Sequence, residues 1–152
     1  MSASAVTPIV APSPRPGIAL RVHPQLPRLV LGAGAVAQQL TDATIAPIPM
    51  CAGWFRGVAR HGGQIVPFFD LAQWADLARD DRTPDVLLSV ADGTCVMGMV
   101  AAESPSILPA GSPVAAWPGK DRWLAQGGAG DVVYTFDPSA WLAEIASSIG
   151  LS

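Results

Sequence analysis

His61 and Asp70 are the pair of residues in this sequence whose chemistry could support catalysis, because a carboxylate can orient an imidazole that acts as a general base. The other histidine, His23, is distant in sequence, and neither histidine has cysteine or acidic neighbours at metal-ligand spacing. The sequence also has no G-x-S-x-G, H-E-x-x-H or Walker motif. Without a nucleophile or metal to complete the pair, we expect His61 to be exposed in a turn and Asp70 to cap a helix. The sequence therefore predicts no catalytic residues, no metal site and no cofactor.

A second pattern with chemical meaning is Gly32-Ala33-Gly34-Ala35-Val36-Ala37, a literal match to the G-x-G-x-x-A fingerprint of dinucleotide-binding turns. That fingerprint requires a following helix and an acidic residue about 20 positions on, which binds the ribose. Here the candidate helix Val36–Leu40 is broken by Thr41-Asp42, and the region near position 52 has no carboxylate. The pattern therefore favours a small-residue turn into a short helix. A small dinucleotide-binding protein that uses the Gly32/Gly34 turn is an alternative.

The composition is poor in charge for a soluble chain of this length. Hydrophobic residues make up 50% of the 152 positions and charged residues 14%, against about 25% charged in an average soluble protein. Such a chain either buries much of its apolar surface or exposes some of it to a partner. A net charge of −3 and a pI of about 5.1 argue against nucleic-acid binding, which needs clustered Lys and Arg. The length favours one domain with a substantial core.

The N-terminus, the apolar runs and the cysteines together indicate the cellular compartment of the protein. No apolar run approaches the roughly 18 residues of a membrane span, and the N-terminus lacks the basic and apolar regions of a secretion signal. We therefore expect a cytoplasmic protein without direct membrane insertion, in which Cys51 and Cys95 are reduced core residues. Residues 1–16 contain four prolines and are predicted to be a disordered lead, so that the domain spans residues 17–152.

The elements that would position the polar residues are short strands joined by glycine turns. Residues 54–74 are typical of a strand, a turn at Gly62-Gly63, a second strand and a helix start capped by Asp70. A second hairpin turn is predicted at Asp92-Gly93, and residues 103–117 are predicted to be a loop. Strands are predicted over residues 18–22, 29–31, 64–69, 86–90, 95–100 and 132–136.

Two six-residue segments, Phe69–Trp74 and Phe136–Trp141, share the pattern Phe-Asp-x-x-x-Trp. In each segment a strand ends, an aspartate caps a helix, and a tryptophan turns back toward the sheet. After Asp137, apolar residues from Trp141 to Ile149 at helical spacing predict a closing helix. Two halves, each of several short strands followed by one helix, suggest two small β-barrels in one mainly β body. The tryptophans expected in the core are Trp54, Trp74 and Trp141.

Four segments of the chain follow one another at characteristic spacing: Pro47-x-Pro49, Gly57-Val58, Gly63-Gln64-Ile65-Val66-Pro67 and Asp70-Leu71. They resemble the signature of the CheW-like chemotaxis adaptor family. That family carries proline-x-proline, glycine-valine, asparagine-leucine-arginine-glycine, proline and aspartate-leucine at this spacing. Its later strands fit the strands predicted near residues 86–100 and 132–136, so that the resemblance spans roughly residue 17 to the end.

This resemblance implies a mainly β fold of two five-stranded, SH3-like β-barrel subdomains, with short capping helices and a C-terminal helix. It implies no enzymatic activity but a signalling adaptor that couples chemoreceptor cytoplasmic tips to a CheA-type histidine kinase. Related members serve the chemosensory systems that control type IV pili and twitching. The residues expected to contact a partner are Arg56, Arg60, His61, Gly62 and Gln64, and those expected to be structural are Gly57, Gly63, Pro67, Asp70 and Asp137.

Gly62 departs from the family pattern. Where the family has Asn-Leu-Arg before the glycine, this chain has Arg60-His61-Gly62, so that the arginine associated with the receptor- and kinase-facing surface is missing. Arg60 offers a guanidinium, but from another backbone position. The main hypothesis is therefore a divergent adaptor tuned to its own receptor or kinase. The alternatives are the dinucleotide-binding protein described above and a degenerate structural module of a signalling assembly.

Overall fold

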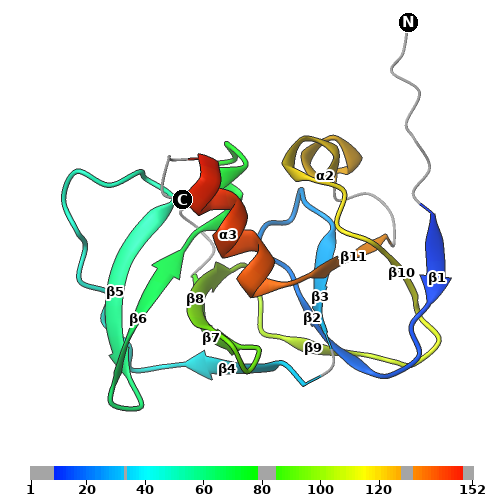
Figure 1. Cartoon of the computed structure of the whole chain (residues 1–152), viewed down its shortest axis with the longest axis horizontal. Coiled ribbons are helices and arrows are strands. Elements are labelled where there is room, and N and C mark those ends of the chain that lie inside the picture. The colour runs from blue at the N-terminus through cyan, green and yellow to red at the C-terminus, as the bar shows by residue number, and fades with distance from the viewer. Residues whose placement is uncertain (1–8, 33, 79–84, 128–131, 149–152) are drawn as a thin grey trace, which may run out of the picture.

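The structure, a computed structural model, describes residues 9–32, 34–78, 85–127 and 132–148 of the chain. Its strands form two sheets that lie side by side along the long axis of the molecule (Figure 1). One sheet has six strands and the other has five, and we refer to them as the six-stranded and the five-stranded sheet. The prediction of a mainly β fold with two β subdomains is confirmed.

The five-stranded sheet is built from one stretch of chain, residues 36–101, in the order β4-β7-β8-β6-β5. Its neighbouring strands are antiparallel except β6 and β8, which run parallel. As predicted, β5 and β6 form a hairpin that turns at Gly62-Gly63, and β7 and β8 form one that turns at Gly93, all three glycines having positive φ. The strands are β4 (Val36–Leu40), β5 (Phe55–His61), β6 (Gln64–Phe69), β7 (Val86–Ala91) and β8 (Val96–Ala101).

The six-stranded sheet comes from both ends of the chain, in the order β1-β10-β11-β3-β2-β9. Its last strand, β11, pairs in parallel with β3, so that Phe136 lies opposite Leu31 in the middle of the sheet. The prediction that the two β subdomains are successive halves of the sequence is therefore wrong. The chain leaves the six-stranded sheet and later returns to it. The strands are β1 (Val10–Pro12), β2 (Gly17–Leu20), β3 (Arg28–Leu31), β9 (Ser106–Leu108), β10 (Pro113–Ala115) and β11 (Val133–Phe136).

Strand β1 corrects the expectation that residues 1–16 lack regular structure, and residues 1–8 of that lead lie outside the described residues. It pairs antiparallel with β10, with Val10 opposite Ala115 and Pro12 opposite Pro113. Proline is tolerated here because β1 is an edge strand, which needs no donor on its outer side. This strand gives its sheet six members where five were expected. The predicted loop over residues 103–117 likewise contains two short strands, β9 and β10.

Strand β4 replaces the short helix predicted after Gly34. It pairs with β7 along its whole length, from Val36 opposite Ala91 to Leu40 opposite Leu87. The local sequence, Val-Ala-Gln-Gln-Leu, has no strong preference for either state, so pairing with the β7 edge decides the conformation. Helical propensity is overridden by tertiary context at this position.

The outer strands of the five-stranded sheet, β4 and β5, approach each other without forming a continuous ladder. Beyond the end of β4, Ala46 and Val58 exchange two backbone hydrogen bonds of 2.8 and 3.0 Å. At the other end of β5, the His61 Nε2 lies 3.3 Å from the Gln38 Oε1. The sheet is therefore strongly curled, and its two edges are held together at isolated points.

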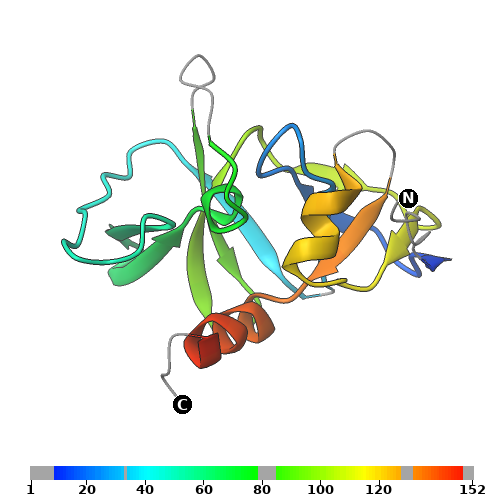
Figure 2. The same cartoon turned by 90° about the horizontal axis from the view of Figure 1, so that it is seen from above.

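Three short helices complete the described fold: α1 (Leu71–Trp74), α2 (Lys120–Gln126) and α3 (Pro138–Ser148). Asp70 caps α1 by accepting from the Gln73 backbone N–H at 3.1 Å. Asp137 stands before α3 and accepts from the Ser139 backbone N–H at 3.0 Å. Figure 2 shows α3 along one side of the molecule, connected to the end of β11.

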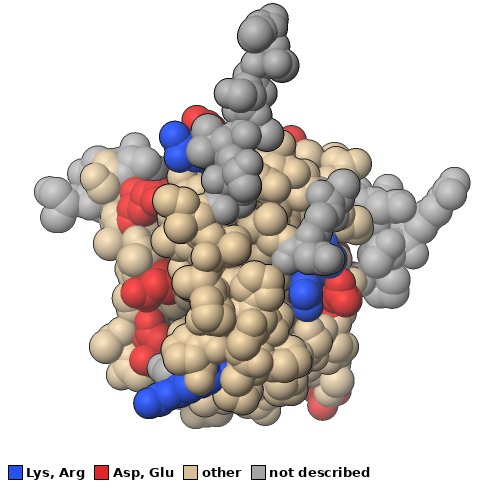
Figure 3. Space-filling view, turned by 90° about the vertical axis from the view of Figure 1, so that its right-hand side faces the viewer, with Lys and Arg blue, Asp and Glu red and all other residues tan. Residues whose placement is uncertain are grey.

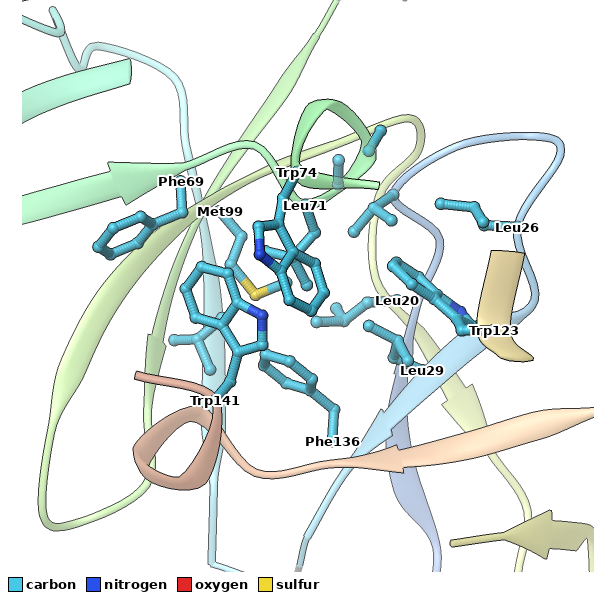
Figure 4. Packing of buried hydrophobic residues seen from close by; sticks show 14 of the residues in the cluster. Leu20, Leu26, Leu29, Phe69, Leu71, Trp74, Met99, Trp123, Phe136 and Trp141 are labelled. Carbon is cyan, nitrogen blue, oxygen red and sulfur yellow. The ribbon is translucent and has the colours of Figure 1, made fainter. Parts of the chain in front are cut away.

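The main core lies where the two sheets meet, and aromatic rings fill its centre (Figure 4). The Trp141 ring centroid lies 5.1 Å from that of Phe69, 5.4 Å from that of Trp74 and 6.3 Å from that of Phe136. The two Phe-Asp-x-x-x-Trp segments therefore meet at this point. Trp74 and Trp141 are buried as predicted, whereas Trp54 is half-buried at the edge of the cluster.

The end of the molecule that carries β1 shows a largely uncharged face (Figure 3). Ile9 is 92% exposed and Val10, the first residue of β1, is also exposed. The low charge of the sequence thus results in apolar surface as well as in a large core.

Candidate partner-binding surface

The turn end of the β5–β6 hairpin carries four of the five residues predicted to contact a partner. The prediction that His61 is exposed in a turn is wrong. His61 is the last residue of β5, and its side chain is half-buried. Beside it in the ladder, Arg60 lies opposite Ile65, whose side chain is 69% exposed. A cation beside an exposed apolar side chain is a combination that protein interfaces favour. We refer to Arg60, His61, Gly62, Gln64 and Ile65 together as the hairpin patch.

A polar hollow of about 290 Å³ lies between the hairpin patch and β4. It is lined by residues 38–43, from β4 and the following loop, and by residues 60–62 of the hairpin. Gln38 and His61, whose side chains are in contact, both line it. Guanidinium, imidazole and amide groups therefore surround a space in which they could bind polar groups of a partner protein.

The fifth predicted contact residue, Arg56, lies at the opposite end of β5 and forms ion pairs within the molecule. Its Nη1 is 3.3 Å from the Asp70 Oδ2, and its Nη2 is 3.8 Å from the Asp85 Oδ2. Asp70 is 1% exposed, and a carboxylate so deeply buried needs such a partner. The structure therefore separates Arg56 from the hairpin patch by roughly 13 Å along the strand, and its guanidinium is engaged in ion pairs within the molecule.

His61 and Asp70 do not form the base–orienter pair considered from the sequence. They lie at opposite ends of the β5–β6 hairpin, because His61 is opposite Gln64 at the turn and Asp70 follows Phe69 at the far end. The His61 Nε2 instead contacts Gln38, and Asp70 caps α1. The geometry supports the structural interpretation of Asp70.

Backbone constraints explain Gly57 and Pro67, two of the residues expected to be structural. Gly57 has a φ of 128°, and a Cβ there would overlap the carbonyl oxygen of Ala46. Pro67 lies opposite Val58 in β5, and the ladder between β6 and β8 begins one residue later, at Phe68. Pro67 therefore lies where β6 has a neighbouring strand on one side only. Because no strand on the other side needs a backbone N–H from this position, the proline breaks no ladder hydrogen bond there. Gly63, in the hairpin turn, has a φ of 77°.

A second hollow, of about 470 Å³, lies where α3 begins and the β7–β8 turn approaches it. Asp92 in that turn accepts hydrogen bonds of 2.9 Å from the backbone N–H groups of Thr94 and Cys95 and one of 2.8 Å from the Ser139 hydroxyl. These bonds, the one from Thr94 foremost, hold the pKa of Asp92 well below its usual range. They also join a turn of the five-stranded sheet to the helix that follows the six-stranded sheet.

The two cysteines are free thiols, but the prediction that they are core residues is wrong. Cys51 is exposed in the loop between β4 and β5, and Cys95 is half-buried just before β8. The Ser139 hydroxyl lies 3.3 Å from the Cys95 Sγ. Burial raises the pKa of the Cys95 thiol, and the exposed Cys51 is the more accessible of the two.

The dinucleotide-binding alternative at Gly32 and Gly34 is wrong. The fingerprint requires a helix whose N-terminus holds the pyrophosphate. The segment after Gly34 is strand β4, which pairs with β7, so this turn does not lead into a helix as the fingerprint requires. The small residues serve the connection between the two sheets, and residue 33 lies outside the described residues.

Ile65 belongs to the hairpin patch and Gln38 contacts it, and neither residue is predicted as a site residue from the sequence. Gln38 reaches the hairpin across the open seam between β4 and β5, which no local pattern in the sequence indicates. The sequence predicts a strand over residues 64–69, but that prediction alone does not say which face of the strand carries Ile65. Period-two alternation with the buried Val66 and Phe68 could have shown that Ile65 points away from the core.

Within the described residues, no helix is long and apolar enough to cross a membrane. The described part of the chain also brings together no group of three or more His, Cys, Asp or Glu side chains that could hold a metal ion.

Comparison with known proteins places this geometry in context. The family model described as CheW-like domain matches residues 17–109. The fold is similar to the crystal structure of the scaffolding protein TtCheW from Thermoanaerobacter tengcongensis, with a TM-score of 0.52 and 16% identity over 65% of this chain and 67% of that chain. None of the curated proteins matches the chain. The family match covers more than half of the sequence and includes the entire five-stranded sheet and the hairpin patch.

Proposed function

The chain belongs to the CheW-like domain family, and from this premise we propose that it is a non-enzymatic signalling adaptor that couples chemoreceptors to a CheA-type histidine kinase. The family match over residues 17–109 is the observation that carries the proposal. The similarity in fold to the scaffolding protein TtCheW supports it. In this function the protein contributes surfaces rather than reactive groups.

The hairpin patch is the surface that we assign to partner binding. Arg60 and Gln64 are exposed on either side of the turn, Ile65 supplies apolar area, and the polar hollow beside β4 offers hydrogen-bonding groups. Arginine with apolar neighbours is enriched in protein interfaces, because the guanidinium binds carboxylates and carbonyls while its stem covers apolar surface. The partner surface is therefore expected to present acidic or carbonyl oxygens next to an apolar side chain.

Gly62 explains why we propose a divergent adaptor. A Cβ built on Gly62 meets no atom within 4 Å, so a side chain at this position would extend into solvent. The family arginine implied for this position would therefore reach outward toward a partner. Because this chain lacks that arginine, Arg60 is the cation of the hairpin patch. The Arg60 side chain leaves the backbone from strand β5 rather than from the turn, so its guanidinium approaches a partner from a different direction.

Charge reversal at Arg60 tests this assignment. Binding of the Arg60→Glu variant to the full-length CheA-type kinase and to a receptor cytoplasmic fragment from the same organism would be measured by calorimetry. We expect affinity for at least one of them to fall about tenfold, which corresponds to about 1.4 kcal/mol. The matched control is Arg122→Glu on the exposed face of α2, which makes the same change in net charge.

The stability of both variants is expected to stay within about 0.5 kcal/mol of the wild type, because neither arginine is buried. Equal affinities for wild type and Arg60→Glu would show that the hairpin patch is not the contact surface. A wild-type protein that binds neither the kinase nor the receptor fragment would refute the adaptor function itself.

A further inference from the structure

The hollow beside the start of α3 has no role in the function proposed above. Its volume of about 470 Å³ lies in the range of small-molecule sites, which is roughly 300–1,000 Å³. The connection between β3 and β4, the β7–β8 turn and the end of β11 all line it, so it lies where the two sheets meet. We refer to it as the α3 hollow; the residues that give it its chemistry are Asp92, Trp117, Phe136, Asp137, Trp141 and Glu144.

Aromatic rings form one wall of the α3 hollow. Figure 4 shows Phe136 and Trp141 beside each other where β11 leads into α3, and each is 3% exposed. Trp117 packs edge-on against Phe136, with ring centroids 6.3 Å apart and an interplanar angle of 82°. Trp117 is half-buried, so part of its ring remains accessible from the hollow that it lines. A flat, electron-rich surface of this kind attracts apolar groups and cations.

Carboxylates supply all of the formal charge around the α3 hollow. Asp92, Asp137 and Glu144 line it, and its described lining includes no lysine, arginine or histidine. Hydrogen bonds from the backbone N–H groups of Thr94 and Cys95 hold the pKa of Asp92 well below its usual range, so Asp92 is ionised at neutral pH. A hollow lined by charges of one sign concentrates ions of the opposite sign.

Two of these carboxylates have oxygen atoms left for a ligand. The Asp137 Oδ1 caps α3 by accepting from the backbone N–H groups of Ser139 at 3.0 Å and Ala140 at 3.3 Å. Within the described residues, the Asp137 Oδ2 accepts no hydrogen bond and the Glu144 carboxylate forms no ion pair. Because Asp137 already satisfies the first N–H groups of α3, the start of this helix is unsuited to an anion.

The lining also argues against two other kinds of ligand. The described part of the chain brings together no group of three His, Cys, Asp or Glu side chains that could hold a metal ion. An uncharged apolar molecule would cover the carboxylates without pairing them, which is unfavourable. An organic cation satisfies both the carboxylates and the aromatic wall.

We propose that the α3 hollow binds a small alkylguanidinium compound from solution, which pairs with Asp137 and Glu144 and lies against Trp117. A guanidinium is favoured over an ammonium because it is planar, stacks on aromatic rings and donates to two carboxylates at once. The volume of the hollow accommodates a whole small molecule rather than the end of a side chain. This inference goes beyond the adaptor function and does not depend on it.

Butylguanidinium and its neutral isostere butylurea test the proposal on the full chain. The two probes have the same alkyl stem and nearly the same shape, and they differ in charge. In NMR titrations, we expect butylguanidinium to produce saturable shifts at millimolar concentration in the amides of residues 135–144 and of the β7–β8 turn. Butylurea is expected to bind about tenfold more weakly, because it lacks the charge that the carboxylates recognise.

Two conservative variants assign the contacts. Asparagine caps helices as well as aspartate does, so Asp137→Asn removes the charge and keeps α3. Glu144→Gln changes an exposed residue of the same helix. Each variant is expected to weaken butylguanidinium binding about threefold. The matched control is Asp76→Asn, an exposed position outside the lining with a φ of 64° that asparagine tolerates, and it should bind as the wild type does.

Three results would overturn the inference. Equal binding of butylurea and butylguanidinium would show that the hollow does not recognise charge. Equal weakening by Asp76→Asn and Glu144→Gln would show that only the net charge of the protein matters. Shifts that do not saturate, or that lie away from α3 and the β7–β8 turn, would show that the hollow is not a binding site. Each of these results leaves the adaptor function to its own test with the kinase and the receptor fragment.

Discussion

At the scale of single residues, the positions that constrain the fold most strongly are those where two backbones approach closely. Gly57 lies against the Ala46 carbonyl oxygen, and a Cβ on Gly98 would overlap the ring of Phe68. Gly62 is different, because its φ is positive but the space around it is open. The same residue type therefore has two distinct roles, close approach at Gly57 and Gly98 and turn conformation at Gly62.

Comparison of Gly57→Ala with Gly62→Ala tests this distinction. Gly57→Ala must displace the Ala46 strand connection, so we expect a loss in the free energy of unfolding of about 2–4 kcal/mol from overlap and unfavourable φ together. Gly62→Ala is expected to cost about 1 kcal/mol, from the positive φ alone. Urea unfolding followed by circular dichroism measures both. Equal losses would contradict the assignment of close backbone contact to Gly57.

At the scale of elements, hairpins with a strong local signal were predictable from the sequence. Gly62-Gly63 and Asp92-Gly93 between apolar runs indicated the β5–β6 and β7–β8 hairpins, because type and spacing of the turn residues determine such turns. The helix cap at Asp137 followed from the same kind of local chemistry. These features depend on residues that are neighbours in sequence.

The elements that sequence reasoning missed depend on distant partners. Val36–Leu40 forms a strand because it can pair with the edge of β7. Val10–Pro12 forms a strand because it can pair with the edge of β10. β9 lies between two prolines and β10 begins with Pro113, and both three-residue strands are too short to show alternation. For the same reason the contact of Gln38 with His61 could not be predicted, since it joins two edges that are 23 residues apart.

The contact between the β7–β8 turn and α3 is expected to depend on pH. Hydrogen bonds lower the pKa of Asp92 in the folded protein relative to the unfolded chain, where it is about 4. The ionised carboxylate therefore contributes stability that is present above that value and is lost as the pH falls below it. Asp92→Asn should be less stable than the wild type at pH 7, and the difference should shrink between pH 4 and pH 2 in urea unfolding series.

Ser139→Ala provides the comparison for that experiment. It removes one hydroxyl donor to Asp92 but leaves the two backbone donors in place. We expect a smaller loss than for Asp92→Asn, with the same decline toward low pH. A difference between Asp92→Asn and wild type that stays constant down to pH 2 would show that the charge of Asp92 does not contribute.

At the scale of the whole molecule, the two sheets share one aromatic core rather than two separate ones. Phe69 ends β6 of the five-stranded sheet and Phe136 ends β11 of the six-stranded sheet, and Trp141 contacts both. The chain itself crosses between the sheets and returns, which adds covalent connections to this packing. The hairpin patch is therefore presented by a body in which the sheets depend on each other.

Trp141→Ala tests whether the two sheets unfold as one unit. Removing a tryptophan that is 3% exposed is expected to lower the free energy of unfolding by about 3–5 kcal/mol, and Leu124→Ala at the surface of α2 is the control, expected within about 1 kcal/mol of the wild type. Because Trp141 packs between the sheets, hydrogen exchange should become faster by a similar factor in the cores of both, in Leu29–Leu31 and in Leu88–Val90. Faster exchange confined to one sheet would show that each sheet is stable independently of the shared core.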